Sequence, residues 1–268
     1  MANKLIIDCG ATKADWIAGD GTRFRTPGFN LAHTPGEQLK AILNEAAQKL
    51  EGVTEIHFYA AGLVENSPVD LQQWFPEAGH IEYASDMLGA ARAVLGRESG
   101  IAAIVGTGAN TCQYDGTRIT HQIPCGGFIL GDEGAASVLG KLFVADFLKG
   151  RVPQAVADAF RAQYPADYPT IVKNVYGSPA PARYLASFAP FILSLYGREE
   201  YVKILVDNNF RAFFERTILQ YPPLPVGVVG GFGHACRDIL TAIGAQYGIR
   251  FTSITASPAE GLILYHGL

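Results

Sequence analysis

Asp8-Cys9-Gly10-Ala11-Thr12-Lys13 is a tight glycine loop, and Gly106-Thr107-Gly108-Ala109-Asn110 is a second one further along the chain. Each loop follows a short apolar run that predicts a β-strand, residues 4–7 and residues 101–105. Glycine lets the backbone approach a bulky anion and point its N–H groups at phosphate oxygens. A threonine in each loop adds a hydroxyl donor. The presence of two such loops indicates that both bind the same polyphosphate through their backbones. Neither the GxxxxGK[ST] loop nor the GxGxxG loop occurs with the right flanks.

The composition is typical of a compact globular enzyme. The chain has 268 residues, which is long enough for two lobes that each bury a core. Hydrophobic residues make up 49% and charged residues 17%, so burial is extensive. The formal net charge of −4, without a basic stripe, argues against a nucleic-acid partner and against an anionic membrane surface.

We expect a cytoplasmic protein. No apolar run reaches the ~18 residues that a membrane span requires, and the chain enters its first strand at Lys4 without a signal peptide. The cysteines form no CxxC pair, which favours a reducing compartment over a disulfide or zinc framework. They are Cys9, Cys112, Cys125 and Cys236. The six histidines show no metal-ligand spacing.

Hydrophobic periodicity predicts an α/β chain. Expected strands cover residues 4–8, 14–18, 22–26, 55–60, 80–84, 101–105, 111–114, 226–229 and 249–254. Expected helices cover residues 87–95 and 234–247, and a largely helical stretch covers 133–220, broken at Gly150, Pro165, Pro169 and 178–181. The two halves share a plan of hairpin, strand, helix and strand.

Two capping boxes mark further helix starts. Thr34-Pro35-Gly36-Glu37 has proline at the first helical position and opens a helix with an apolar stripe at helical spacing. Ser257-Pro258-Ala259-Glu260 opens a short final helix.

These motifs carry a resemblance to a known family. The chain is similar to the N-acetylglucosamine kinases of the BadF/BadG/BcrA/BcrD ATPase family, within the superfamily of actin, sugar kinases and heat-shock chaperones. The similarity covers nearly the whole chain. The matching motifs, in order, are Asp8-x-Gly-x-Thr-Lys, Gly106-Thr-Gly-x-Asn110, Gly126-Gly127, Gly131-Asp132-Glu133-Gly134 and Gly230-Gly231.

The resemblance implies an α/β fold of two ribonuclease-H-like (actin-like ATPase) lobes, with the ATP site in the cleft between them. Residues 1–104 form the expected N-terminal lobe, and residues 105–256 form the C-terminal lobe with a helical insertion. The final helix, 257–268, is expected to pack back on the N-terminal lobe.

The family also implies ATP and Mg²⁺ as ligands. The expected nucleotide-binding residues are Asp8, Gly10, Thr12, Gly106, Thr107, Gly108, Gly230 and Gly231. Asp8 matches the aspartate that holds Mg²⁺ through water, in keeping with the preference of Mg²⁺ for a carboxylate, phosphates and retained waters. Taken alone, Asp8 could equally cap a turn. Lys13 is assigned no role.

Two aspartates compete for the catalytic role. Asp86 ends a strand and precedes a helix, so its plain structural role is an N-cap. Its family counterpart faces the sugar hydroxyl that is phosphorylated, where a carboxylate orients the hydroxyl and accepts its proton. Asp132 begins a helix, where the macrodipole favours negative charge. We interpret Asp86 as the base and Asp132 as a ligand of sugar hydroxyls and of the metal shell. The sequence leaves open which of the two aspartates is the base.

The acceptor site is expected to use amides as well as carboxylates. The residues expected to bind the sugar are Asn30, Asp86, Asn110, Gly127 and Asp132. Each asparagine offers both a donor and an acceptor to neighbouring hydroxyls. The chain departs from the animal kinases in two places, because Ala32 replaces their tryptophan and the path from Gly127 to Gly131 is shorter.

The leading hypothesis is ATP-dependent phosphorylation of N-acetylglucosamine to its 6-phosphate. Glucosamine, N-acetylmuramate or another hexose remains open as the acceptor. A family ATPase that activates another enzyme through an iron–sulfur cluster is a second class, but the scattered cysteines do not supply the expected ligand pair. A nucleotide-sensing binding module is a third. The sequence leaves the oligomeric state open, with a homodimer among the options.

Overall fold

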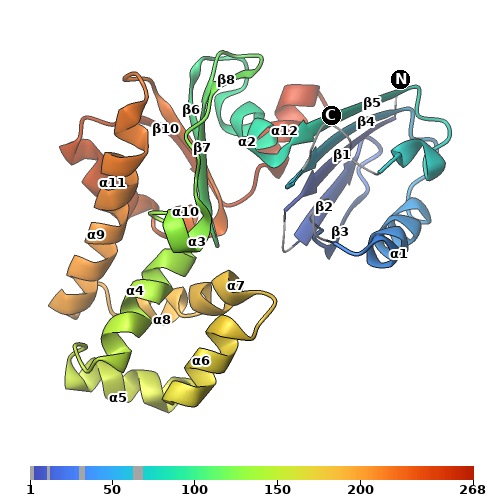
Figure 1. Cartoon of the computed structure of the whole chain (residues 1–268). Coiled ribbons are helices and arrows are strands. Elements are labelled where there is room, and N and C mark those ends of the chain that lie inside the picture. The colour runs from blue at the N-terminus through green and yellow to red at the C-terminus, as the bar shows by residue number, and fades with distance from the viewer. Residues whose placement is uncertain (1–2, 11–12, 30–33, 63–68) are drawn as a thin grey trace. The chain divides into compact units, whose positions relative to one another are not determined.

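The computed structural model describes residues 3–10, 13–29, 34–62 and 69–268. The chain divides into two compact units, each with its own sheet (Figure 1). The first unit contains residues 1–98, 114–119 and 257–268, and the second contains residues 99–113 and 120–256. The two units are described separately below.

The first unit is built on a five-stranded sheet with the order β3-β2-β1-β4-β5. Its strands are β1 (Lys4–Cys9), β2 (Lys13–Ala18), β3 (Arg23–Pro27), β4 (Glu55–Ala60) and β5 (His80–Ser85). β2 pairs antiparallel with β1 and β3, while β4 pairs parallel with β1 and β5. Strands covered on both faces read as continuous apolar runs, and Leu5, Ile6 and Ile7 are all fully buried.

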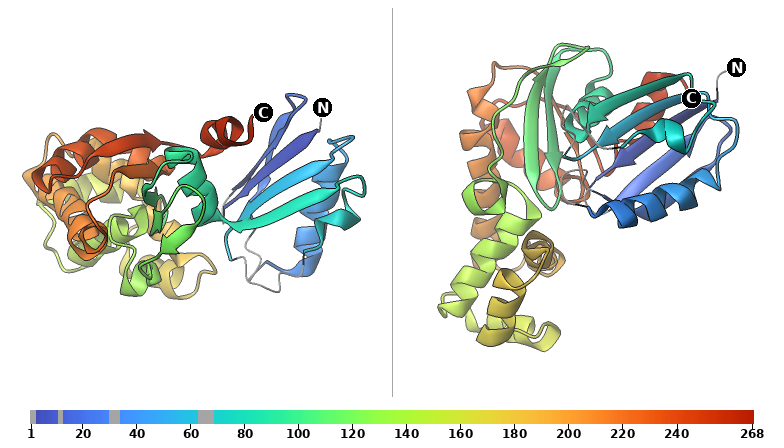
Figure 2. Two further views of the ribbon diagram at one scale, coloured as in Figure 1. Left: turned by 90° about the horizontal axis from the view of Figure 1, so that it is seen from above. Right: turned by 45° about the vertical axis from the view of Figure 1, so that its right-hand side comes forward.

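Helices cover both faces of this sheet (Figure 2). On one face, α1 (Gly36–Ala47) packs its stripe of Leu39, Ile42 and Leu43 into a core with β1. On the other face, α2 (Asp86–Leu95) and α12 (Ala259–His266) pack together around Leu262. A short 3-10 helix, η1 (Leu71–Gln73), closes the loop before β5. The final helix therefore belongs to the first unit, although it follows the second unit in sequence.

Proline is the N-cap residue at both predicted capping boxes. α1 begins at Gly36 with Pro35 as its N-cap residue. α12 begins at Ala259 with Pro258 as its N-cap residue, and the hydroxyl of Ser257 accepts a hydrogen bond from the N–H of Ala259 at 3.3 Å. Glu260 pairs instead with Arg23 of β3, at 2.6 Å. Proline took the cap position at both helices, so each helix begins one residue later than the pattern predicted.

A polar network fixes the last turn of α12 to the sheet. The hydroxyl of Tyr59 lies 2.7 Å from Nε2 of His266 and accepts a hydrogen bond from Arg92, also at 2.7 Å. The ring of His57 stacks on His266 with centroids 3.6 Å apart. Burial lowers the pKa of His266 from its ordinary 6.5 to about 3, and the charges of His57 and Arg92 lower it further, while Glu82 opposes them. His266 is therefore a neutral acceptor for Tyr59.

We predict that His266 makes the protein less stable in mild acid. The unfolded chain binds a proton on this ring near pH 6.5, and the folded chain binds it only near pH 3. Stability therefore falls as the pH drops from about 6.5 towards about 3, because the unfolded state holds more protons in that range. Urea unfolding midpoints at pH 7.5 and pH 5.0 measure this loss.

His266→Gln keeps an acceptor but cannot titrate, so the loss between the two pH values should shrink. His121→Gln, at an exposed histidine, should leave it unchanged. An equal loss in wild-type protein and His266→Gln would show that other groups carry the acid sensitivity.

The second unit repeats the sheet of the first. Its strand order is β10-β9-β6-β7-β8. Read from the other edge, β8, β7 and β6 occupy the places that β3, β2 and β1 occupy in the first sheet. The strands are β6 (Gly100–Val105), β7 (Ala109–Tyr114), β8 (Ile119–His121), β9 (Val226–Val229) and β10 (Phe251–Thr255). β9 pairs parallel with β6 and with β10. The repeated plan expected from the sequence is thus present, and the predicted fold class, two such α/β units, is confirmed.

Most helices of the second unit lie between β8 and β9 in sequence. They are α3 (Gly127–Leu130), α4 (Ala136–Leu148), α5 (Gln154–Gln163), α6 (Tyr168–Tyr176), α7 (Pro181–Ala186), α8 (Ala189–Ser194), α9 (Glu200–Arg216) and the 3-10 turn η2 (Ile218–Gln220). α9 and α7 pack beside α4, while α5 and α6 lie at the far end of α4 (Figure 1). After β9, α10 (Gly231–Ala235) and α11 (Arg237–Gln246) follow.

Phenylalanines form the core of this helical part. The ring of Phe160 lies within 5.3 Å of the rings of Phe143, Phe188 and Phe191, centroid to centroid. The predicted helix break at Pro169 was wrong, because this proline lies in the first turn of α6, where its missing N–H costs nothing. Across the described parts of the chain, no helix is both long and apolar enough to cross a membrane.

Candidate active site

Three carboxylates gather at the carboxyl ends of β1 and β5 in the first unit. Asp8 lies opposite Asp15 in the antiparallel register of β1 and β2. Asp15 is held by Arg25 at 2.5 Å and by Lys13 at 3.4 Å. Asp8 has no hydrogen-bond or ion-pair partner of its own among the residues that the structure describes. Within the described residues, Asp15 therefore has two ion-pair partners, whereas Asp8 and Asp86 have none.

The surroundings of Asp8 favour the binding of a cation. Burial raises the pKa of Asp8 to about 7, and the charges of Asp15 and Asp86 raise it further, whereas Lys13 lowers it. An uncompensated carboxylate that other carboxylates destabilise gains most from a positive ion. Lys13 also has a function that the sequence did not predict, because it pairs with Asp15 and moderates the charge at Asp8.

Asp86 is not the N-cap of its helix. Ser85 is the N-cap residue, and its hydroxyl accepts a hydrogen bond from the backbone N–H of Leu88 at 3.1 Å. Asp86 is the first helical residue, and one of its oxygens accepts from the N–H of Met87 at 2.9 Å. Burial raises the pKa of Asp86. The structural role that competed with catalysis is thus filled by the neighbouring serine.

Two predicted site residues, Thr12 and Asn30, lie outside the described residues. Of the first glycine loop, Gly10 is described, and its N–H donates to the carbonyl of Lys13 at 3.0 Å. A Cβ at Gly10 would lie 3.6 Å from that carbonyl oxygen, which is an ordinary contact. The fold itself therefore tolerates a side chain at this position.

The second glycine loop is tied to the start of α4. The N–H of Ala136 donates to the carbonyl of Gly106, and the N–H of Ser137 donates to the carbonyl of Thr107. A Cβ at Gly106 would meet nothing within 4 Å, whereas a Cβ at Gly108 would lie 2.9 Å from a carboxylate oxygen of Asp132. A side chain at position 108 would therefore force the carboxylate of Asp132 to move.

Asp132 is held in an unusual backbone conformation. Its φ of +55° is the one positive value among the described non-glycine residues. Its N–H donates to the carbonyl of Cys125 at 2.9 Å, and its own carbonyl accepts from the N–H of Ala135. Burial raises the pKa of Asp132, and a hydrogen bond from the backbone of Ala109 opposes that rise. Backbone strain of this kind occurs preferentially at functional sites.

Asn110 and Gly127 flank Asp132 in the second unit. The side-chain oxygen of Asn110 accepts from the N–H of Thr111 at 2.9 Å and from the amide of Gln122 at 3.0 Å. Its amide nitrogen makes no hydrogen bond within the described ranges, so the donor half of this amide remains for a ligand. Gly127 begins α3 with a φ of +67° and has open space beside it.

Gly230 and Gly231 are glycines for different reasons. Gly230 has a φ of +135°, and a Cβ there would lie 2.3 Å from the carbonyl oxygen of Val105. Close packing of β6 against the start of α10 therefore requires glycine at position 230. A Cβ at Gly231 would meet nothing within 4 Å, so no part of the described fold excludes a side chain there.

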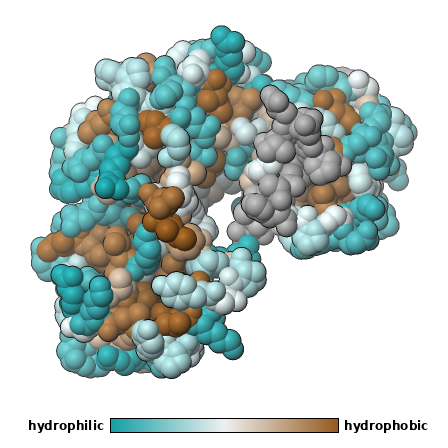
Figure 3. Space-filling model, viewed as in Figure 1, coloured by the Kyte–Doolittle hydropathy of each residue, from teal (hydrophilic) through white to brown (hydrophobic). Residues whose placement is uncertain are grey.

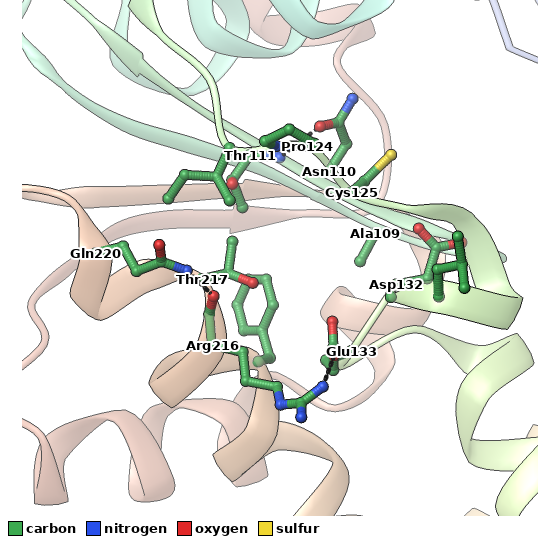
Figure 4. A pocket seen from close by; sticks show the side chains of 14 residues that line it. Ala109, Asn110, Thr111, Pro124, Cys125, Asp132, Glu133, Arg216, Thr217 and Gln220 are labelled. Atoms are coloured by element: carbon green, nitrogen blue, oxygen red, sulfur yellow. Dashed lines mark hydrogen bonds and ion pairs between the residues drawn. The ribbon is translucent and has the colours of Figure 1, made fainter.

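A pocket of about 320 Å³ lies in the second unit beside Asp132 (Figure 4). Asn110 and Asp132 line one side, together with Cys125 and the exposed Leu130 of α3. The opposite side consists of α9 and η2. Phe213 and Arg216 come from α9, Gln220 comes from η2, and Thr217 lies between the two elements. Glu133 joins the two sides through an ion pair with Arg216 at 2.7 Å.

Sequence reasoning missed a buried asparagine behind Asp132. Asn209 of α9 is 2% exposed. Its side-chain oxygen accepts from the N–H of Gly134 at 3.2 Å, and its amide donates to the carbonyl of Ala135 at 3.3 Å. The spacing of Asn209, Phe213 and Arg216, which puts them on one face of α9, was the available signal.

We predict that Asn209→Ala destabilises the protein by roughly 1–3 kcal/mol, because it leaves the buried N–H of Gly134 unpaired, while the carbonyl of Ala135 keeps its hydrogen bond from Leu139. Denaturant unfolding measures this loss. Asn208→Ala is a matched control, since Asn208 is exposed on the same helix and should change stability by less than about 0.5 kcal/mol. Equal effects in the two variants would mean that the hydrogen bonds from Asn209 to Gly134 and Ala135 do not contribute to the free energy of unfolding.

The described residues contain no ready-made cage for a metal. Across them, histidine, cysteine, aspartate and glutamate side chains do not gather in groups of three or more that could hold an ion. A single carboxylate such as Asp8 is nevertheless what Mg²⁺ uses when phosphates and waters supply its other ligands.

Solved structures resemble the whole chain, although no protein-family model and no protein with curated annotation matches it. A candidate N-acetylglucosamine kinase from Porphyromonas gingivalis is 37% identical over 99% of this chain and 98% of its own, with a TM-score of 0.91. A second such candidate, from Chromobacterium violaceum, is 22% identical over 99% of both chains, with a TM-score of 0.73. A ROK family glucokinase from Streptomyces griseus, solved with glucose and AMPPNP, is 14% identical over 98% of both chains, with a TM-score of 0.58.

The repeated sheet order and these likenesses define the fold as that of the actin-like ATPase sugar kinases. At 37% identity over nearly its whole length, the chain belongs to the same family as the Porphyromonas gingivalis protein.

Proposed function

We propose that the protein phosphorylates N-acetylglucosamine on its 6-hydroxyl with ATP, as a member of the BadF/BadG/BcrA/BcrD ATPase family. The observation that carries this proposal is the 37% identity with the Porphyromonas gingivalis candidate N-acetylglucosamine kinase, which extends over 99% of the chain. The glucokinase with a similar fold was solved with AMPPNP, which supports an ATP-type donor.

In this proposal, the glycine loop of the second unit binds the phosphates of ATP. Gly106 has open space beside it, so phosphate oxygens can approach its backbone. Thr107 adds a hydroxyl donor, and its carbonyl is fixed by the N–H of Ser137. Backbone donors that are held in place before ATP binds need no rearrangement when charge develops on the transferring phosphoryl group.

Mg²⁺ is the metal that fits this chain, with Asp8 as its protein ligand. The fit rests on the lack of a countercharge at Asp8 and on the neighbouring carboxylates that raise its pKa. When bound, Mg²⁺ would neutralise negative charge on the phosphates. Asp15 is already paired with Arg25 and Lys13, whereas Asp8 has no ion pair among the described residues and remains available as a ligand.

Asp86 is the proposed base. Its carboxylate orients the 6-hydroxyl and accepts its proton while the hydroxyl oxygen bonds to the γ-phosphorus and the bond to ADP breaks. Burial raises the pKa of Asp86, which makes the carboxylate a better proton acceptor than an exposed aspartate. Asp132 and the free amide hydrogens of Asn110 are proposed to bind sugar hydroxyls.

ATP consumption across a panel of sugars tests this function. The panel should include N-acetylglucosamine, glucosamine, N-acetylmannosamine and glucose, each compared with ATP alone. N-acetylglucosamine should give the highest kcat/KM, with little ATP consumed in the absence of sugar. ATP hydrolysis that no sugar stimulates would favour an ATPase over a sugar kinase.

A further inference from the structure

The pocket beside Asp132 has an unequal balance of charge. Two carboxylates, Asp132 and Glu133, and one guanidinium, Arg216, line it, so its formal charge is negative. The other polar groups at its surface are the neutral amides and hydroxyls of Asn110, Thr111, Thr217 and Gln220. A substituent that enters this space therefore meets a net negative charge.

The ion pair controls how much positive charge the pocket offers. Glu133 and Arg216 are 2.7 Å apart, and their side chains are 18% and 70% exposed. The carboxylate of Glu133 is thus the more buried partner. The guanidinium of Arg216 lies at the rim of the pocket and is paired with this carboxylate (Figure 4). As long as Glu133 holds Arg216, an incoming carboxylate finds no free cation and pays for desolvation without a partner.

The rest of the wall suits a short uncharged group. Ile123, Leu130 and Phe213 supply apolar surface, and α3 with its exposed Ile129 and Leu130 forms an apolar lip at the molecular surface (Figure 3). A methyl group can contact such a wall, and an adjacent amide can bond to the side-chain amides and hydroxyls of the same pocket. This combination matches the acylamino group of an N-acyl hexosamine.

We propose that the Glu133–Arg216 pair selects the charge of the acceptor sugar: the pocket admits a neutral acylamino hexosamine and rejects one that bears a carboxylate. This inference rests on the proposed function, and it resolves the choice between N-acetylglucosamine and N-acetylmuramate in favour of the first. Glu133 and Arg216 act here through binding and take no part in proton transfer.

Two substitutions shift the selectivity in opposite directions. Glu133→Gln removes one negative charge and frees Arg216 to pair with a carboxylate on the sugar. Arg216→Gln removes the positive charge and leaves Glu133 without its partner, which makes the pocket more negative. Glu200→Gln is the control, because Glu200 is exposed at the start of the same helix, α9, and does not line the pocket.

The test compares two sugars that differ in charge but hardly in size, N-acetylmuramate and its methyl ester. Calorimetry gives the ratio of their dissociation constants without any turnover. Alkylation of Cys125 gives a second readout, because this pocket cysteine is exposed while Cys9, Cys112 and Cys236 are buried. A bound sugar should slow alkylation, and Cys125→Ser should abolish the signal.

The wild-type protein should bind the ester at least about tenfold more tightly than the acid, a ratio that corresponds to ~1.4 kcal/mol. Glu133→Gln should reduce this ratio about tenfold, Arg216→Gln should increase it, and Glu200→Gln should leave it unchanged. An unchanged ratio in Glu133→Gln overturns the inference, and so does failure of every variant to bind either sugar.

N-acetylglucosamine in the same experiments separates this inference from the proposed function. Selective binding of the ester without phosphorylation of N-acetylglucosamine would contradict the kinase alone. Phosphorylation of N-acetylglucosamine together with equal binding of acid and ester would contradict the charge selection alone.

Discussion

Asp86→Asn should lower kcat for sugar phosphorylation by about 10²–10⁴-fold, the usual contribution of general-base catalysis. Asparagine is nearly the same size but cannot accept the hydroxyl proton. The helix should be unaffected, because Ser85 caps α2 and the asparagine oxygen can still accept from the N–H of Met87. Steady-state kinetics at saturating ATP and sugar measure the effect, with melting temperature and ATP binding as controls expected to stay near wild type.

Asp132→Asn is the comparison that assigns the base. It should weaken sugar binding and change kcat much less once both substrates are saturating. A nearly normal kcat in Asp86→Asn, together with a collapsed kcat in Asp132→Asn, would exchange the two roles.

Gly108→Val should reduce kcat/KM by at least about 10²-fold, a loss of ~2.7 kcal/mol in transition-state stabilisation. The first side-chain carbon alone would lie 2.9 Å from a carboxylate oxygen of Asp132, so that carboxylate must move. Displacement of Asp132 should impair sugar binding as well as the phosphate loop. Titration of sugar and ATP against the folded variant measures both losses.

Gly106→Ala separates the two effects, because a methyl group at position 106 meets nothing within 4 Å in the described fold. It should leave sugar binding unchanged and weaken ATP binding if phosphates approach this backbone. A Gly108→Val variant that folds and keeps wild-type affinity for both substrates would remove the loop from the site.

The strands were predictable because their signal is local. Runs such as Leu5–Ile7 and Val226–Val229 are apolar, short and bounded by glycine or polar residues, so β1 and β9 fall where the pattern places them. Helix starts were less predictable. A capping box and a proline occur together at both Pro35 and Pro258, and sequence alone does not show which residue takes the cap position.

The candidate site divides in the same way. Asp8, Asp86 and Asp132 were each predictable, because each lies in a short local segment of sequence that can be recognised without the fold. The reason for glycine at position 108 does not, because the colliding group belongs to Asp132 on a different segment. Asn209 and Arg216 were missed for the same physical reason, since α9 is distant from the Asp132 loop in sequence and contacts it only through the tertiary fold.

The most direct test of the account is the stoichiometry of the reaction with N-acetylglucosamine. The purified protein, ATP, Mg²⁺ and the sugar should yield one ADP for each sugar phosphate, with phosphorus NMR placing the phosphate on the 6-oxygen. ADP released with inorganic phosphate, and no phosphorylated sugar, would contradict the assignment of this chain as an N-acetylglucosamine kinase.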